Sequence, residues 1–403
     1  MNPDTRPLAQ FAHAPLLLLV IAYLMMQPLS TDLYLASLPS LATTFNVPTS
    51  TVQLTLSVFV IGFGFAQLIV GPLSDRYGRR PVLLWGLAIY ALGSALCTFA
   101  PSIQLLIAAR VLQAIGCCCA IMNSRAIVRD AYDPEHSVKV ITRASTWLAL
   151  APLLGPILGS YLQVTFGWRA AFVVHTLLST TLLVLTFLRL PETNLHKNPD
   201  ATNLAGLSAN FRLVLGAREF WAYALPGALS YGALFAFISG ASTVLIRVLQ
   251  VPTEYFGYCF AFGVSGYLCG TLVCRRLLAR IGTPATFRVG STMSLAAGAL
   301  FLAAVLAGLA HWSIVVIAMS LTMGAHGINY PVSQAGAVNP FPRQAGTAAG
   351  LAGALSMLVA FIVGTIVGAS YNGTLTPLAV LAGALGLSIF VAARMFVPMQ
   401  TAT

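Results

Sequence analysis

The chain has 403 residues, of which 58% are hydrophobic and only 8% are charged. Soluble domains carry about 25% charged residues, so this composition excludes a soluble cytosolic enzyme. The net charge of +11 is compatible with nucleic-acid binding, but most of the 21 Lys and Arg residues flank long apolar runs, as they do in membrane proteins. We therefore expect no nucleic-acid partner and a chain embedded in a lipid bilayer.

Twelve apolar runs are each long enough to cross a bilayer, because a hydrocarbon core of about 30 Å requires about 20 residues of helix. They lie at 15–38, 50–71, 81–100, 102–126, 138–164, 168–190, 219–247, 253–274, 284–309, 312–338, 345–370 and 374–397. We predict an all-α integral membrane protein with twelve transmembrane helices. The first run lacks a clear signal-peptide cleavage site and is expected to remain as the first span.

A polar stretch at 191–218 divides these runs into six and six. The two halves have nearly equal length, which predicts two pseudo-symmetric six-helix bundles with a binding site between them near the membrane midplane. The predicted organisation is a cytoplasmic N-terminal segment 1–14, a bundle 15–190, a cytoplasmic linker 191–218, a bundle 219–397 and a cytoplasmic tail 398–403.

Most Lys and Arg residues fall at one set of helix ends when the N-terminus is placed inside the cell. These bases are Arg6, Arg76, Arg79, Arg80, Arg125, Arg129, Lys139, Arg143, Arg189, Lys197, Arg212, Arg218, Arg275, Arg276, Arg280, Arg288, Arg343 and Arg394. Because cytoplasmic loops are enriched in Lys and Arg, we predict a multi-pass protein with both termini in the cytoplasm.

Two kinds of site are not expected. The seven cysteines lie in or beside apolar runs, so neither a disulfide framework nor a metal site is indicated. The sequence also lacks the GxxxxGK[ST] phosphate-binding loop, so direct nucleotide-driven pumping is not supported.

The first apolar run contains Asp32, whereas the other acids in and between the runs map to loops or helix ends. Burial disfavours the charged form of a carboxyl group, and water or a cation favours it. A lone intramembrane carboxyl group is therefore a natural proton carrier, and one such group suggests one proton per cycle. The alternative is that Asp32 only holds Arg110 in place.

The loop between the second and third runs reads GPLSDRYGRRP at 71–81. It resembles the loop signature of the major facilitator superfamily and lies at the corresponding position. The resemblance implies a cytoplasmic latch that closes against the start of the eleventh run near Thr347 when the transporter faces outward. The implied gate residues are Gly71, Asp75, Arg76, Arg79 and Arg80. The equivalent loop at 274–282 keeps its bases but has no acid, so a latch there is doubtful.

The fourth run contains RVLQAIG at 110–116, which resembles the RxxQGxG pattern of the same superfamily, with Ala114 in place of the first Gly. An arginine about two turns inside a span costs several kcal/mol unless it is paired or hydrated. The resemblance implies that Arg110 acts in proton coupling or lines the substrate cavity. Static pairing with carbonyl and carboxylate groups is the alternative.

The fifth run contains APLLGPILGS at 151–160, which resembles the Gly-Pro motif of drug/proton antiporters. Prolines kink a helix and glycines let a neighbour approach closely. The implied kink residues are Pro152, Gly155, Pro156 and Gly159. The resemblance implies a bend against the glycines Gly263, Gly266 and Gly270 of the eighth run, which seals the periplasmic side. Ordinary small-residue packing is the alternative.

The strings TDLYLASLP at 31–39, PLSDR at 72–76 and GWR at 167–169 narrow the resemblance. They are similar to those of the bicyclomycin and chloramphenicol resistance branch of the twelve-span drug/proton antiporters. This implies efflux of amphiphilic antibiotics, such as phenicols or bicyclomycin, in exchange for protons across the bacterial inner membrane. It also implies a monomer with no enzymatic activity and no cofactor beyond the proton gradient.

Two other functions remain open. The first is proton-coupled transport of a small metabolite, such as a sugar or an amino acid, on the same fold. The second is a transport-dead sensor or an intramembrane enzyme. Some drug exporters of the superfamily have a further acid about two turns before Asp32, where this chain has Leu24. That departure weakens any expectation of a strong preference for cationic drugs.

The first, fourth, seventh and tenth runs line the central path in the superfamily, so their polar, aromatic and Met residues are the candidates for the substrate cavity. Aromatic and Met side chains adapt to varied apolar molecules, and sparse amides orient them. The candidates are Tyr23, Met26, Gln27, Gln113, Asn123, Tyr231, Phe235, Phe237, His326, Asn329, Tyr330 and Gln334. For each of them, contact with lipid or a neighbouring helix is the alternative.

Overall fold

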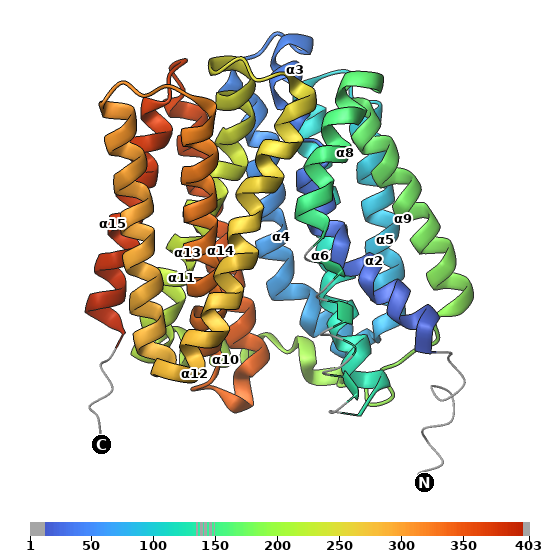
Figure 1. Ribbon diagram of the computed structural model, residues 1–403. Coiled ribbons are helices and arrows are strands. Elements are labelled where there is room, and N and C mark those ends of the chain that lie inside the picture. The colour runs from blue at the N-terminus through green and yellow to red at the C-terminus, as the bar shows by residue number, and fades with distance from the viewer. Residues whose placement is uncertain are drawn as a thin grey trace.

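The computed structural model describes residues 13–133, 136, 137, 140, 143, 144, 147, 148 and 150–397. Within these ranges every regular element is a helix, and ten helices are long and apolar enough to cross a membrane. Figure 1 shows them side by side, with the first turn of α2 and the last turn of α15 at the same end. The fold is an all-α, multi-pass membrane fold. The sequence-based expectations for Arg6, Lys139 and the tail 398–403 fall outside the described residues.

The first half of the chain contributes the helices before the linker. They are α2 (His13–Asp32), the 3₁₀ turn η2 (Leu35–Ser37), α3 (Leu38–Thr44), α4 (Thr49–Tyr77), α5 (Arg79–Thr98), α6 (Ile103–Ala131), α8 (Ala151–Phe166) and α9 (Arg169–Arg189).

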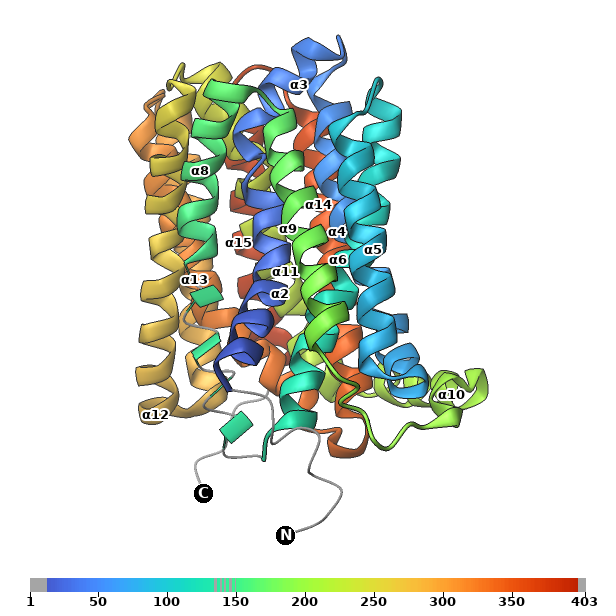
Figure 2. The same ribbon diagram turned by 90° about the vertical axis from the view of Figure 1, so that its right-hand side faces the viewer.

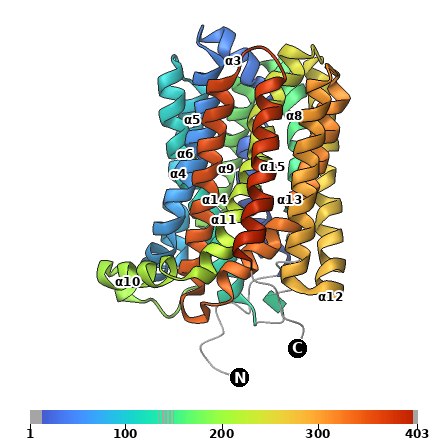
Figure 3. The ribbon, with the colours of Figure 1, turned by 90° about the vertical axis from the view of Figure 1, so that its left-hand side faces the viewer.

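The linker and the second half contribute the remaining elements. They are η3 (Pro199–Thr202), α10 (Leu204–Leu215), α11 (Arg218–Ser242), the π-helical turn η4 (Thr243–Val248), α12 (Thr253–Leu306), α13 (Trp312–Val338), η5 (Pro342–Gln344), α14 (Ala345–Ser370) and α15 (Thr376–Phe396). Figures 2 and 3 show α10 running along the end of the bundle, across the direction of the long helices.

The helices differ from the predicted runs at three main places. The segment 71–81 was expected to be a loop, but α4 continues to Tyr77 and α5 begins at Arg79, so only Gly78 separates the two helices. The first run was predicted to continue to residue 38, but α2 ends at Asp32 and the chain turns through η2 before α3. The runs 253–274 and 284–309 form the single element α12, with a sharp turn at Gly282, whose φ of 71° is the left-handed conformation that glycine adopts readily. The runs 312–338 and 345–370 coincide with α13 and α14.

The halves meet along two helix pairs, α4 with α14 and α8 with α12. Glycines bring the pairs together because a side chain at those positions would collide with the partner. A methyl group on Gly64 would lie 2.7 Å from the Cβ of Met357, and one on Gly257 would lie 2.5 Å from the Cα of Ile157. Close backbone approach through small residues is a common way for membrane helices to associate.

The predicted partner of the eighth-run glycines is wrong. Gly263, Gly266 and Gly270 face α13 rather than the fifth run, and a methyl group on Gly270 would lie 2.0 Å from the carbonyl oxygen of Gly324. The contact between α12 and α8 is made by Gly257 instead, which lies between one and two turns before Gly263 on α12. The reason is that α12 has neighbours on both sides, and its densest glycine face is turned toward α13, with which it forms the tighter pair.

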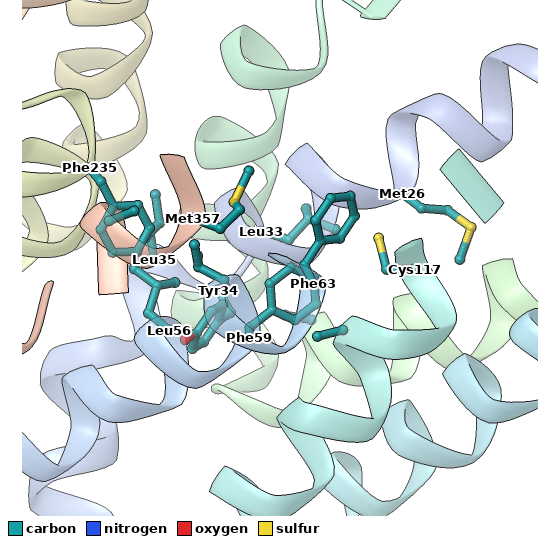
Figure 4. Packing of buried hydrophobic residues seen from close by; sticks show 14 of the residues in the cluster. Met26, Leu33, Tyr34, Leu35, Leu56, Phe59, Phe63, Cys117, Phe235 and Met357 are labelled. Carbon is teal, nitrogen blue, oxygen red and sulfur yellow. The ribbon is translucent and has the colours of Figure 1, made fainter. Parts of the chain in front are cut away.

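A buried apolar layer joins the two halves beside Asp32. Figure 4 shows Phe235 of α11 and Met357 of α14, both from the second half, close to Leu35 of η2 and to Leu33. The labelled residues are Met26, Leu33, Tyr34, Leu35, Leu56, Phe59, Phe63, Cys117, Phe235 and Met357, all of them buried. The chain is therefore tightly packed across its halves at this level of the bundle.

Candidate functional site

A cavity of about 970 Å³ lies between the two halves, at the end of the bundle where α10 is found. Its walls come from α4 and α6 in the first half and from α13 and α14 in the second. The lining residues used below are Gln27, Phe63, Gln67, Asp75, Arg79, Met122, Arg125, Arg129, Tyr330, Gln334, Arg343, Thr347 and Met357. A volume of this size accommodates a drug-sized molecule.

Three of the predicted cavity residues line this space, namely Gln27, Tyr330 and Gln334. Tyr330 and Gln334 are one turn apart on α13, so they lie on the same face of that helix. The sequence missed the contribution of α4 and α14, including Gln67 and Met357. Gln67 belongs to the apolar run of α4, where an amide side chain is the signal that was available.

The other predicted cavity residues lie inside the bundles in this conformation. The Tyr23 hydroxyl is 2.6 Å from Thr186 Oγ1, and Asn123 is bonded to Ser74 at 2.5 Å. The amide of Asn329 donates to Ser294 at 3.0 Å. The remaining members, none of which lines the cavity, are Met26, Gln113, Tyr231, Phe235, Phe237 and His326.

An aromatic cluster surrounds His326 one turn from Tyr330 on α13. The imidazole ring lies 5.0 Å from the ring of Tyr330, 5.8 Å from that of Tyr231 and 5.9 Å from that of Tyr267. Its Nδ1 is 3.0 Å from the hydroxyl of Ser230. Of these side chains, only that of Tyr330 reaches the cavity wall.

The opposite end of the bundle is closed by contacts between the halves. Gln53 of α4 donates to the carbonyl of Ser239 at 3.2 Å, and Arg247 of η4 donates to the carbonyl of Pro39. The hydroxyls of Tyr161 in α8 and Tyr258 in α12 are 2.8 Å apart. The cavity therefore opens toward the α10 end of the bundle and is closed toward the other.

Asp32 is 4% exposed and lies at the last residue of α2. Its Oδ1 accepts a hydrogen bond of 2.8 Å from Thr31 Oγ1, and no Lys, Arg or His of the described chain lies within ion-pairing distance. It follows Gln27 by five residues, or about 7–8 Å along the helix, so it lies beyond the cavity toward the closed end. A carboxyl group in this setting is best accommodated in its neutral form.

Arg110 is fully buried and makes no ion pair with Asp32. It donates to the carbonyls of Thr55 and Ser30 at 3.1 and 3.0 Å and to Gln113 Oε1 at 2.5 Å. Its guanidinium carbon lies 4.2 Å from the ring centre of Phe59 and 4.7 Å from that of Tyr34. Carbonyl dipoles and aromatic faces thus surround the cation, while one of its nitrogens has no partner.

The predicted gate residues interact with the first half and with the linker. Arg79 pairs with Asp75 at 2.5 Å and with Asp130 at 2.8 Å. Arg76 donates to Thr202, and Arg80 donates to the carbonyl of Phe187 at 2.8 Å. Gly71 and Thr347 both line the cavity. Asp75 makes no hydrogen bond or ion pair with α14, so the halves are apart at this end.

The junction between α4 and α5 at Gly78 is also held by the segment that follows α9. Glu192 accepts hydrogen bonds from the backbone N–H groups of Arg79 and Arg80, at 2.8 and 3.3 Å, and so satisfies the first turn of α5. Asn198 N–H and Asn194 Nδ2 donate to the carbonyl of Asp75 at 3.0 and 3.3 Å. Hydrogen bonds from the linker therefore hold the junction between α4 and α5 in place, which was not predicted from the sequence.

The predicted kink residues lie against the end of α2. A methyl group on Gly155 would be 3.0 Å from the Cβ of Asp32, and one on Gly159 would be 2.2 Å from the carbonyl oxygen of Leu33. Pro156 lies inside α8, and Pro152 is in its first turn. The glycine face of α8 thus packs directly on the residue that the sequence singles out as proton carrier.

Comparison with known proteins adds three findings. The model of the Major Facilitator Superfamily matches residues 19–365. A bicyclomycin resistance protein homolog of Haemophilus influenzae is 29% identical over 89% of this chain and 90% of its own length, and a chloramphenicol resistance protein of Pseudomonas aeruginosa is 31% identical over 73% and 69%.

A further comparison, with solved structures, concerns the fold. The crystal structure of a bacterial homolog of the human lysosomal transporter Spinster, in an inward-facing and unoccupied conformation, has a TM-score of 0.71. It covers 96% of this chain and 99% of that one at 18% sequence identity, a level at which the likeness describes the fold alone.

Proposed function

The chain belongs to the Major Facilitator Superfamily, and we propose that it exports amphiphilic antibiotics such as phenicols or bicyclomycin in exchange for protons. The observation that carries the proposal is the match, along most of the chain, to relatives named for bicyclomycin and chloramphenicol resistance. A drug-sized cavity between the two halves supports it. The protein acts as a transporter, and it needs no cofactor beyond the proton gradient.

The proposal includes the finer architecture. Twelve spans are obtained when α8 is added to the ten apolar helices and α12 is counted as two spans joined at Gly282. The arginines at the α10 end support a cytoplasmic location for that end and for both termini, because cytoplasmic loops are enriched in Lys and Arg. The protein is then a monomer of the bacterial inner membrane, and its cavity faces inward.

The transport cycle follows from the two ends of the bundle. In the inward-facing state the cargo enters between α4, α6, α13 and α14, where Gln27, Tyr330 and Gln334 supply polar contacts to an otherwise apolar molecule. The contacts that close the outer end, such as Gln53 with the Ser239 carbonyl, must break when the halves rock. The end of α4 that carries Asp75 then closes on the start of α14 and seals the cytoplasmic end.

Asp32 couples this movement to protons. In the inward-facing state it is buried with one hydroxyl donor, a setting that favours the neutral carboxyl group. Hydration or a nearby cation favours the charged form, so a change in packing at α2 changes the affinity for the proton. Gly155 and Gly159 of α8 contact this turn, which gives the kink motif a direct mechanical link to the carboxyl group.

Antibiotic susceptibility tests the proposal. Expression of the chain in a bacterial host that lacks its main efflux pumps is expected to raise resistance to chloramphenicol and bicyclomycin, and a protonophore is expected to cancel the effect on cellular drug accumulation. Asp32→Asn provides the matched inactive control. Unchanged susceptibility together with proton-dependent uptake of a sugar or amino acid would identify the chain as a metabolite carrier instead.

A further inference from the structure

The mouth of the inward-facing cavity is strongly cationic. Its lining contains four arginines, namely Arg79, Arg125, Arg129 and Arg343, and one acid, Asp75. Arg79 is offset by its two carboxylate partners, Asp75 and Asp130. The other three guanidinium groups form no ion pair with any carboxylate of the described ranges, so the wall carries uncompensated positive charge.

These three arginines come from both halves. Arg125 and Arg129 are one turn apart on α6, so their side chains leave the same face of the helix. Arg343 precedes α14 in the opposite half. All three are exposed yet line the cavity.

Membrane topology alone does not account for this placement. The positive-inside rule requires bases near the cytoplasmic helix ends, and Arg275 and Arg276 of α12 fulfil it without lining the cavity. Arg125 and Arg129, by contrast, lie on the path that a cargo molecule takes. Clustered like charges at the rim of a cleft attract ligands of the opposite sign and repel those of the same sign.

We propose that Arg125, Arg129 and Arg343 form an anion-binding site at the cavity mouth, and that the preferred cargo carries a carboxylate on an apolar body. This inference rests on the proposed transport function. Guanidinium groups present paired N–H donors that match the two oxygens of a carboxylate. Phe63, Met122 and Met357 offer adaptable apolar surface for the rest of the molecule.

The site also predicts what the protein rejects. A cationic amphiphile meets three uncompensated positive charges before it reaches Gln27 and Tyr330. Asp32, the only buried carboxyl group among the described residues, does not line the cavity. For cargo molecules of the same shape, the expected affinity is therefore highest for the acidic form, lower for the neutral form and lowest for the cationic form.

Binding of matched fluorescent probes to the purified protein tests this order. Dansylglycine, dansylglycinamide and a dansyl trimethylammonium compound share one aromatic body and differ in charge. We expect the carboxylate to bind about tenfold more tightly than the amide, and the cation to bind more weakly than both. The Arg125→Gln/Arg129→Gln variant is expected to lose the tenfold difference, and 1 M salt is expected to reduce it in the unmodified protein.

Two further variants control for folding and for general charge. Arg125→Lys/Arg129→Lys keeps both charges and is expected to keep most of the preference for the carboxylate, whereas Arg275→Gln/Arg276→Gln removes two cytoplasmic charges outside the cavity and is expected to leave all three affinities unchanged. Equal affinity for the three probes, or an unaltered order in the double Gln variant, would overturn the anion site.

Transport of uncharged chloramphenicol separates the two proposals. If the protein moves chloramphenicol against its gradient but shows no charge order among the probes, only the anion site is refuted. If neither chloramphenicol nor any probe is bound or moved, the proposed drug export fails as well.

Discussion

Replacing Asp32 with asparagine is the sharpest test of the coupling mechanism. Asparagine has the same shape, and its side-chain oxygen can still accept the hydrogen bond that Thr31 gives to Asp32 at 2.8 Å. The variant removes only the capacity to gain and lose a proton. We therefore expect a folded protein that binds chloramphenicol and equilibrates it across the membrane but no longer accumulates it.

The size of the effect follows from the number of buried acids. Asp32 is the only Asp or Glu among the buried residues of the described chain, which supports one proton per cycle. One proton crossing a gradient of one pH unit provides about 1.4 kcal/mol, which is a tenfold concentration ratio. With a gradient of one pH unit, the unmodified protein is expected to reach a ratio of drug concentrations across the membrane of at most about tenfold. Asp32→Asn is expected to give equal concentrations on the two sides.

Proteoliposomes with the membrane potential clamped to zero provide the assay. The ratio of radiolabelled chloramphenicol across the membrane is measured after an acid jump. Glu254→Gln is the matched control, because Glu254 is an exposed acid in the first turn of α12. This variant is expected to keep the tenfold ratio. A tenfold ratio in Asp32→Asn would refute the assignment of the proton to Asp32, and a hundredfold ratio in the unmodified protein would require a second proton site.

Three other substitutions test the packing around this site. Gly159→Ala places a methyl group 2.2 Å from the carbonyl oxygen of Leu33, so we expect about 1–3 kcal/mol lower stability, a lower Tm in detergent and loss of efflux; an unchanged Tm would contradict the close contact. Arg110→Lys replaces the separate donor nitrogens Nε and Nη1 by one ammonium nitrogen, which cannot occupy both positions; we expect a loss of about 3 kcal/mol, measured by chemical denaturation against the unmodified protein. Gly257→Ala wedges α12 from α8 at the closed end, so hydrogen–deuterium exchange should show a smaller inward-facing population. Gly206→Ala, where nothing lies within 4 Å, should leave every readout unchanged.

Long apolar runs bounded by polar residues could be predicted from the sequence. The runs 312–338 and 345–370 match α13 and α14, because the membrane imposes both a minimum length and an apolar composition on a helix that crosses it. The end of α2 could not be predicted. The run continues through apolar residues to Leu38, and nothing local to the sequence requires a break at Asp32.

The break at Asp32 is a tertiary effect. The carbonyl of Leu29 is 3.1 Å from Nε2 of His175, which donates to it from α9, and the carbonyl of Ser30 accepts a hydrogen bond from Arg110 of α6. In a continuing α-helix, the Ser30 carbonyl would instead accept from the N–H of residue 34. Two distant side chains thus hold the backbone where the helix stops.

The cavity lining was predictable only in part, for a similar reason. Tyr23 and Gln27 are one turn apart on the same helix, yet the Tyr23 side chain is bonded to Thr186 while Gln27 lines the cavity. Which polar residue of a span faces the cavity depends on the rotation and tilt of the helix against its neighbours. Those quantities are set by packing, as at Gly64 against Met357, and they are not encoded in one run alone.

The separation of Asp32 from Arg110 gives the coupling model its physical basis. If the two formed a buried ion pair, protonation of the carboxyl group would leave a buried cation without a counter-charge, at a cost of several kcal/mol. Here the cation is held by the carbonyl of Ser30 near the C-terminal end of α2 and by the rings of Phe59 and Tyr34. In the proposed mechanism, Asp32 takes up and releases a proton while Arg110 keeps the end of α2 fixed, so the change in charge acts on the contact between α2 and α8 within the first bundle.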